Sequence, residues 1–216
     1  MNWQRATTTA KKDERKEAIY SAALMLFKEK GYEKVSFNGI AAQANFTKSN
    51  MYRYFSSKEE IFLSIFSDLF ESWFNDVHRE LSNLEQSADL EIFTKVWVET
   101  YSAYPEFLDL IPILFTSLEN NSSYEQLVIF KGKSKHLLYQ LALDINQLYP
   151  ELNIDKCFTF LTLSFAATSN YWAAESKQSD ALKKLYQEEE FLMLKPNFKQ
   201  SLTTAIEVTM KGLLAK

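Results

Sequence analysis

The chain has 216 residues, of which 46% are hydrophobic and 15% aromatic, and it holds only four Gly and four Pro. This composition predicts a folded, helix-rich protein and disfavours a large β fold, which needs more turn residues. The net charge of −4 argues against a protein that coats nucleic acid over its whole surface. We also expect a cytoplasmic protein with no membrane partner. No apolar run approaches the roughly 20 residues that span a bilayer, the N-terminus lacks the apolar core of a secretion signal, and the single Cys157 excludes an internal disulfide.

The charge is distributed unevenly along the chain. Residues 1–60 carry 11 Lys or Arg and 7 Asp or Glu, a net charge of +4, whereas residues 61–216 carry a net charge of −8. A basic N-terminal region followed by an acidic remainder indicates that the N-terminal region alone contacts phosphate groups.

The N-terminal region is predicted to form a unit of three helices. Residues 1–9 are expected to be a disordered polar arm, and residues 11–30 to form an amphipathic helix that ends at Gly31. Two shorter helices follow within residues 36–55. We therefore expect an N-terminal domain over residues 1–56.

Two capped helices joined by a tight turn are predicted between Ser36 and Lys58. The hydroxyls of Ser36 and Thr47 can cap the two helices, and apolar residues flanking each cap are spaced to pack on one another. Asn45 lies at the turn and tolerates a left-handed backbone better than most residues do. This arrangement is typical of a helix-turn-helix, whose second helix enters the major groove of DNA with its N-terminal residues leading.

The remaining residues, 57–216, are predicted to form a helical domain. A long helix should begin at Ser57, which has capping-box spacing with Glu60, and should connect the two domains. Further amphipathic helices are expected over residues 89–104, 106–118 with a kink near Pro112, 124–148, 153–176 and 196–214. Residues 177–195 are expected to be a loop or a short helix. The fold class is therefore all-α, with about nine helices.

The helix predicted over residues 153–176 is apolar on two nearly opposite faces. One face can pack on its own chain, and the other then needs a partner. We expect this helix and the last helix to form a homodimer, which would supply the second half-site that a helix-turn-helix generally needs. The predicted interface residues are Phe160, Leu163, Ala167, Tyr171, Leu202 and Ile206.

No pattern of residues predicts an enzyme. The chain lacks a phosphate-binding Gly-rich loop, a nucleophile elbow and a Cys/His pair at a useful spacing. His78 has no companion ligand at metal spacing, and the helical periodicity places His136 on a solvated face. We therefore expect no catalytic residues, no metal and no cofactor.

Residues 22–62, AALMLFKEKGYEKVSFNGIAAQANFTKSNMYRYFSSKEEIF, resemble the tetracycline-repressor (TetR) family of one-component transcriptional regulators. The family's usual run consists of an "AA…LF…G" first helix, a "T/S…IA…AGVS" second helix and a "K…YxxF…K" recognition segment. The resemblance implies a three-helix DNA-binding domain joined to a helical domain that binds an effector and dimerises. Two positions depart from the family pattern, because Asn45 and Ser49 stand where Gly is frequent.

The resemblance also implies roles for individual residues in the motif. The positions that match phosphate contacts are Ser36, Thr47, Tyr52, Tyr54 and Lys58. Those that match the leading turn of the recognition helix, which contacts base edges, are Lys48, Ser49 and Asn50. Lys suits the acceptors of guanine and Asn suits adenine, whereas Ser is permissive. Phe55 is expected to be a core residue.

For the second domain, the resemblance implies a small-molecule pocket in each subunit. The candidate lining residues are Phe66, Phe70, Trp97, Thr100, Tyr101, Tyr104, Phe115, Ser134 and Phe165. Their aromatic character favours an apolar or flat ligand, although aromatic residues at helical spacing are more often ordinary core. The expected function is a homodimeric repressor that binds a palindromic operator in double-stranded DNA and is released by an apolar or aromatic effector. A TetR-like activator and a helical protein–protein adaptor remain the alternatives, and an adaptor would show no salt-dependent binding to a palindromic duplex.

Overall fold

The structure, a computed structural model, describes residues 3–215 and gives side-chain positions from residue 11 onward. These residues form two compact units, each described separately below. The first comprises Met1–Ser67 with Leu114–Phe130, and the second comprises Asp68–Ile113 with Lys131–Lys216. The sequence-based boundary at residue 56 divides the chain differently, because it assigns the start of the fourth helix and the 114–130 segment to the second domain.

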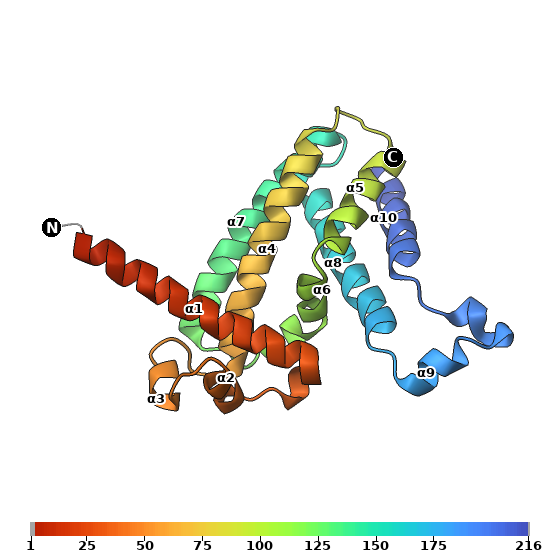
Figure 1. Cartoon of the computed structure of the whole chain (residues 1–216). Coiled ribbons are helices and arrows are strands. Elements are labelled where there is room, and N and C mark those ends of the chain that lie inside the picture. The colour runs from red at the N-terminus through yellow and green to blue at the C-terminus, as the bar shows by residue number, and fades with distance from the viewer. Residues whose placement is uncertain (1–2, 216) are drawn as a thin grey trace. The chain divides into compact units, whose positions relative to one another are not determined.

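The described residues form helices and connections and contain no strand, so the predicted all-α class is confirmed (Figure 1). The α-helices are α1 (Trp3–Lys30), α2 (Phe37–Gln43), α3 (Lys48–Met51), α4 (Lys58–Ser82), α5 (Leu90–Ser102), α6 (Pro105–Leu110), α7 (Tyr124–Leu148), α8 (Ile154–Ser176), α9 (Asp180–Leu185) and α10 (Phe198–Leu214). The short turns of helix are η1 (Tyr32–Lys34), η2 (Ile111–Ile113), η3 (Leu114–Leu118) and η4 (Glu189–Leu194). No helix of the described chain is long and apolar enough to cross a membrane.

In the first unit, α1 packs on α2, and α2 packs on α3 (Figure 1). The apolar stripe of α1 supplies buried residues such as Ile19 and Ala23, and Ile40 and Met51 fill the other side of the core. The expected disordered arm is wrong for residues 3–9, since α1 begins at Trp3, while residues 1–2 lie outside the described residues. Once a helix has formed, each added residue contributes a hydrogen bond, and this stretch contains no Gly or Pro to stop it.

The connection between α6 and α7 changes helix type twice. α6 gives way to a 3₁₀ turn, η2, at Ile111 and then to a π-helical turn, η3, at Leu114. Pro112 lies at the first change, because it has no backbone N–H for an α-helical hydrogen bond. The kink expected near Pro112 is therefore present as this change of helix type. A π turn is rare and is often found at functional sites.

The second unit is built around stacked aromatic rings. Trp97 lies at the centre, and the centroids of Trp73, Phe93 and Phe160 lie 5.8, 5.7 and 4.9 Å from its own. Tyr101 stacks on Trp73 with ring centroids 4.4 Å apart. α10 packs along α8 and α5 and so covers part of this core (Figure 1). Cys157 is buried in this unit, and burial raises the pKa of its thiol to about 11.

Three of the predicted interface residues are buried within the protomer. Phe160, Leu202 and Ile206 are almost completely inaccessible, so their side chains cannot face a partner, which corrects the prediction for these positions. The physical reason is that the face of α8 bearing Phe160 packs on α5, and the stripe of α10 with Leu202 and Ile206 packs inward. Leu163 is exposed, and Ala167 and Tyr171 are half-buried, so these three stay predictions.

Candidate nucleic-acid interface

The turn between α2 and α3 has the geometry that its sequence predicts. The Ser36 hydroxyl oxygen accepts a hydrogen bond from the backbone N–H of Gly39 at 3.1 Å, and that of Thr47 accepts one from Asn50 at 3.2 Å. Asn45 has a φ of 58°, the left-handed conformation expected of it. Each capping hydroxyl keeps its own O–H, which can still donate to a phosphate oxygen.

Gly39 is explained by the same cap. A Cβ atom at this position would lie 3.1 Å from the Ser36 hydroxyl oxygen, which is tighter than most side chains tolerate. A glycine at this position therefore lets the backbone N–H of Gly39 come close to the Ser36 hydroxyl. In a helix interior, glycine costs about 1 kcal/mol relative to Ala.

The leading turn of α3 is accessible. Lys48, Ser49 and Asn50 are all exposed, while Met51 behind them is buried. The Lys48 ammonium lies 5.7 Å from the centroid of the Tyr52 ring, which leaves its charge at the surface. The structure thus brings the three candidate base contacts together on one open turn of helix.

The candidate phosphate-contacting residues near this turn differ in how exposed they are and in whether they are already hydrogen-bonded. Ser36, Thr47 and Tyr52 are exposed, and the Tyr52 ring packs 5.1 Å from Phe37. Tyr54 is half-buried, and its hydroxyl accepts a 3.4 Å hydrogen bond from Arg15 of α1. An Arg beside this hydroxyl adds a cation to the same surface, and no pattern in the sequence marks it.

Lys58 has partners inside the first unit. Its ammonium donates to the carbonyl oxygen of Tyr32 at 3.2 Å and lies 4.3 Å from the centroid of the Tyr32 ring. A carbonyl and an aromatic face stabilise a cation in the first turn of a helix, where the helix dipole disfavours it. The predicted phosphate role of Lys58 is not tested by this geometry.

Tyr32 and Glu60 hold the Leu114–Phe130 segment against the three-helix unit. The buried Tyr32 hydroxyl is hydrogen-bonded to Ser117 at 2.9 Å. The buried Glu60 carboxylate accepts hydrogen bonds from the backbone N–H groups of Ser56 at 2.7 Å and Ser123 at 3.2 Å. Sequence reasoning recognised Glu60 only as a capping residue, and nothing in the sequence marks Tyr32, Ser117 or Ser123.

We expect the Glu60→Gln variant to be less stable than the wild type at neutral pH, and we expect this difference to disappear in acid. Burial raises the pKa of Glu60, but the hydrogen bonds from Ser123 and Ser56 outweigh it and leave the pKa below its ordinary value of 4.5. The carboxylate therefore adds stability that is fully present above pH 4.5 and is lost as the pH falls through its lower folded-state pKa. Removing the charge should cost about 1–3 kcal/mol at pH 7, measured by urea unfolding.

The pH series has a matched control in the exposed Glu125 of the first unit. Because Glu125 lies in the first turn of α7, its replacement by Gln should cost at most about 1 kcal/mol through the helix dipole. The difference in unfolding free energy between wild type and Glu60→Gln should shrink as the pH drops below 4.5. A difference that stays constant from pH 7 to pH 3 would show that the charge of Glu60 does not stabilise this contact.

Several of the predicted effector-pocket residues pack on one another instead of lining free space. Trp97 and Tyr101 belong to the aromatic core, and the Thr100 hydroxyl donates to the carbonyl of Trp97 at 2.9 Å. Phe115 is 56% exposed on η3 of the first unit. The pocket role of the nine predicted residues stays a prediction. Of those not yet placed, Phe70 and Ser134 are buried and Phe165 is half-buried in the second unit, and Phe66 is buried in the first.

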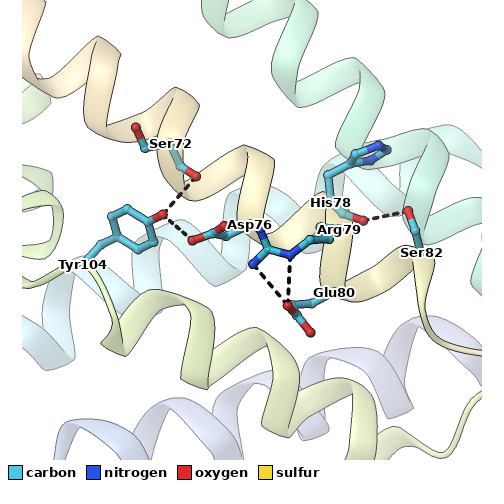
Figure 2. Close-up of polar contacts among 7 residues, drawn as sticks. All are labelled: Ser72, Asp76, His78, Arg79, Glu80, Ser82 and Tyr104. Carbon is cyan, nitrogen blue, oxygen red and sulfur yellow. Dashed lines mark hydrogen bonds and ion pairs between the residues drawn. The ribbon is translucent and has the colours of Figure 1, made fainter.

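Tyr104, at the start of α6, forms hydrogen bonds with α4. Its hydroxyl donates to the carbonyl of Ser72 at 3.1 Å and makes a short hydrogen bond to the carboxylate of Asp76, which also pairs with Arg79 (Figure 2). Burial and the bond to Asp76 raise the pKa of Tyr104 to about 12, and the same bond lowers the pKa of Asp76. The hydroxyl of this candidate pocket residue is therefore already engaged within the chain.

Two family models match the chain in succession. Residues 19–65 match the model described as bacterial regulatory proteins, tetR family, and residues 67–216 match the model described as tetracyclin repressor-like, C-terminal domain. The chain belongs to the TetR family. The resemblance found in residues 22–62 is confirmed, and the two models extend the match over residues 19–65 and 67–216. TetR-family members are DNA-binding transcription factors without enzymatic activity.

Curated relatives of this TetR-family protein are HTH-type transcriptional regulators. It is 29% identical over 102 residues to YfiR of Bacillus subtilis (strain 168), covering 47% of this chain and 45% of YfiR. It is 26% identical over 92 residues to RutR of Escherichia coli (strain K12), covering 43% of each. The matched region thus spans less than half of the length of either relative.

Solved structures share the complete TetR-family fold. FadR from Thermus thermophilus, a repressor solved in complex with lauroyl-CoA, has a TM-score of 0.60 at 17% identity, covering 93% of this chain and 96% of that one. The fatty acid degradation regulator FadR from Bacillus halodurans has a TM-score of 0.56 at 17% identity, covering 93% and 95%. At this identity the likeness establishes the fold alone.

Proposed function

We propose that this TetR-family regulator is a homodimeric repressor that binds a palindromic operator and is released by a small apolar or aromatic effector. The observation that carries the DNA-binding role is the exposed first turn of α3, where Lys48, Ser49 and Asn50 follow a capping Thr47. Such a turn fits the major groove, and the capping hydroxyls beside it are placed to meet phosphates. A regulator of a bacterial chromosome acts in the cytoplasm, which we propose as its location.

A homodimer is supported by the outward face of α8. Residues 157–174 contain no charged side chain, although Leu163, Ala166 and Asn170 are exposed at helical spacing. On α10, which packs along α8, Val208 is 64% exposed. An uncharged face on α8, beside an exposed apolar residue of α10, is suited to packing against a partner helix.

An apolar effector is supported by the chemistry of the second unit. Its core is aromatic, yet the indole N–H of Trp73 and the hydroxyl of Ser134 are buried without a hydrogen-bond partner. Buried polar atoms of this kind cost free energy until something pairs with them. A ligand with an apolar body and one polar group, such as the acyl compound bound by the Thermus FadR, would satisfy both requirements.

Transmission to the DNA-binding unit would use the Leu114–Phe130 segment. This segment belongs to the first unit, where Tyr32 and Glu60 form hydrogen bonds with it, and it is joined covalently at both ends to the second unit. A ligand that alters the course of α6 or α7 would therefore pull on those two hydrogen-bonded contacts. The orientation of the recognition helices in a dimer would change in response.

Selection of binding sites from a random duplex library tests the proposed function directly. We expect the purified full chain to enrich an inverted repeat, with half-sites about one helical turn apart, because a two-fold dimer presents two recognition helices. Binding of the enriched duplex should weaken steeply with salt, as several phosphate contacts release counterions. Failure to enrich any sequence, with no salt-dependent binding, would refute DNA recognition and favour the protein–protein adaptor.

A further inference from the structure

The chain makes a long detour between α8 and α10. Residues 177–197 leave the end of α8 and return to the same place, where the Glu175 carboxylate accepts a 2.5 Å hydrogen bond from the backbone N–H of Phe198. The Trp172 ring packs edge-on against Phe198, with ring centroids 5.1 Å apart. Because α8 and α10 are already adjacent at this point, a few residues would have been enough to join them.

This 177–197 segment is ordered without a core of its own. Ser179 caps α9 by accepting a hydrogen bond from Leu182 at 3.2 Å, and Asn197 caps α10 in the same way through Gln200. Yet no residue from 177 to 197 is buried, and neither α9 nor η4 has a buried side chain. Figure 1 shows the segment with α9 extending away from the ends of α8 and α10.

The most exposed part of the segment is apolar. Leu192, Met193 and Leu194 follow one another in η4 with 51%, 88% and 62% of their surface accessible. Three consecutive exposed apolar side chains in a structured turn are unfavourable in water, and such patches mark protein contacts. Ordered apolar residues with no burial in the protomer indicate a surface that another molecule covers.

We propose that the 177–197 segment is an arm that packs on the second copy of this chain. The arm is rooted at the end of the α8 and α10 face that the proposed homodimer uses, so a partner docked on that face lies beside it. This inference rests on the proposed homodimer and adds a contact beyond the paired helices. Two-fold symmetry gives each dimer two such arm contacts, because each copy both provides an arm and receives one.

Site-specific photo-cross-linking locates the surface beneath the arm. p-Benzoylphenylalanine is introduced in place of Met193 in the full chain, and in place of Ile129 as a control that is also exposed, on α7. We expect irradiation to give a dimer-mass adduct from position 193 and none from position 129. A chain that sediments as a dimer but gives only monomer-mass adducts from position 193 overturns the arm and leaves the dimer intact. A chain that sediments as a monomer at all concentrations overturns both proposals.

Sedimentation equilibrium then measures the contribution of the arm. Leu192→Asp with Met193→Asp should raise the dimer dissociation constant by about tenfold or more, since two apolar contacts are lost in each arm. The matched control is Val128→Asp with Ile129→Asp, which changes two exposed apolar residues of α7 and should have no such effect.

A mixed dimer provides a further check on the geometry. With one wild-type arm and one variant arm, its dissociation constant should be half the geometric mean of the two homodimer values, because the two arm contacts are equivalent and separate and a mixed dimer can form in two equivalent ways. A variant homodimer as tight as wild type, with unchanged circular dichroism, would refute the contact.

Discussion

Replacing Asn50 with Asp is expected to weaken binding to the selected operator by about 30-fold to 25,000-fold. A bidentate Asn–adenine contact is worth about 1–3 kcal/mol, and a dimer loses it in both half-sites. The substitution keeps the size of the side chain, and the cap is undisturbed because the Thr47 hydroxyl bonds the backbone N–H of residue 50. Only the amide donor is lost and a negative charge is gained next to phosphates.

The measurement is a titration of labelled operator at fixed salt, together with a second site selection on the variant. Asn83→Asp is the matched control, because it adds the same charge at an exposed position of the second unit. That control should leave affinity within about twofold, since an exposed charge outside the helix-turn-helix is screened by salt. An Asn50→Asp variant with unchanged affinity and unchanged base preference would exclude a base-contacting role for Asn50.

Lys58→Ala separates phosphate contacts from base contacts in the same assay. If Lys58 meets a phosphate, the variant should bind all sequences more weakly and lower the salt slope by about 1. Because the Lys58 ammonium also lies over the Tyr32 ring, the unfolding free energy of the variant must be measured alongside. A changed base preference with the slope intact would contradict the phosphate role.

Replacing Trp97 with Ala is expected to destabilise the protein by about 3–5 kcal/mol, the usual cost of deleting a buried aromatic side chain. Trp97 is fully buried and contacts four aromatic rings, and its indole N–H donates to the Ser164 hydroxyl at 2.7 Å. The four neighbouring rings belong to Trp73, Phe93, Tyr101 and Phe160. Removing the ring leaves a cavity that these neighbours cannot fill without leaving their stacked positions.

Urea unfolding followed by far-UV circular dichroism gives the free energy, and two further variants separate packing from hydrogen bonding. Ser164→Ala keeps the indole but removes its acceptor, and should cost about 1–3 kcal/mol. Ile92→Ala, on the exposed side of the same helix α5, should change the free energy by less than about 0.5 kcal/mol. A loss below about 1 kcal/mol for Trp97→Ala would mean that this cluster does not hold the second unit together.

The helix-turn-helix could be predicted in detail because its determinants are local. The caps at Ser36 and Thr47 and the left-handed Asn45 each depend on a few neighbouring residues, and all three have the predicted conformation. The start of α6, expected at residue 106 and found at Pro105, and the range of α7, Tyr124–Leu148, were also predictable from periodicity and from residues that favour helix ends. The N-terminal arm was the local exception, since α1 continues to Trp3.

The sequence predicted less well which face of each helix is buried within the protomer and which is exposed. α8 is apolar on two sides, and sequence periodicity offers no means of deciding which side its own chain covers. The structure buries Phe160 and leaves Leu163 exposed, which reverses half of the predicted interface. The choice depends on α5 and α10, whose own positions follow from the packing of the entire unit.

The sequence by itself therefore determined the family, the all-α class and the exposed turn of α3, because caps, turns and helical periods act over a few residues. Only the tertiary structure decided which distant side chains meet. Tyr32 reaches Ser117 across 85 positions and Glu60 reaches Ser123 across 63, so no local pattern could reveal either contact. It also showed that residues 177–197 fold without burial, since burial exists only once the surrounding helices have packed.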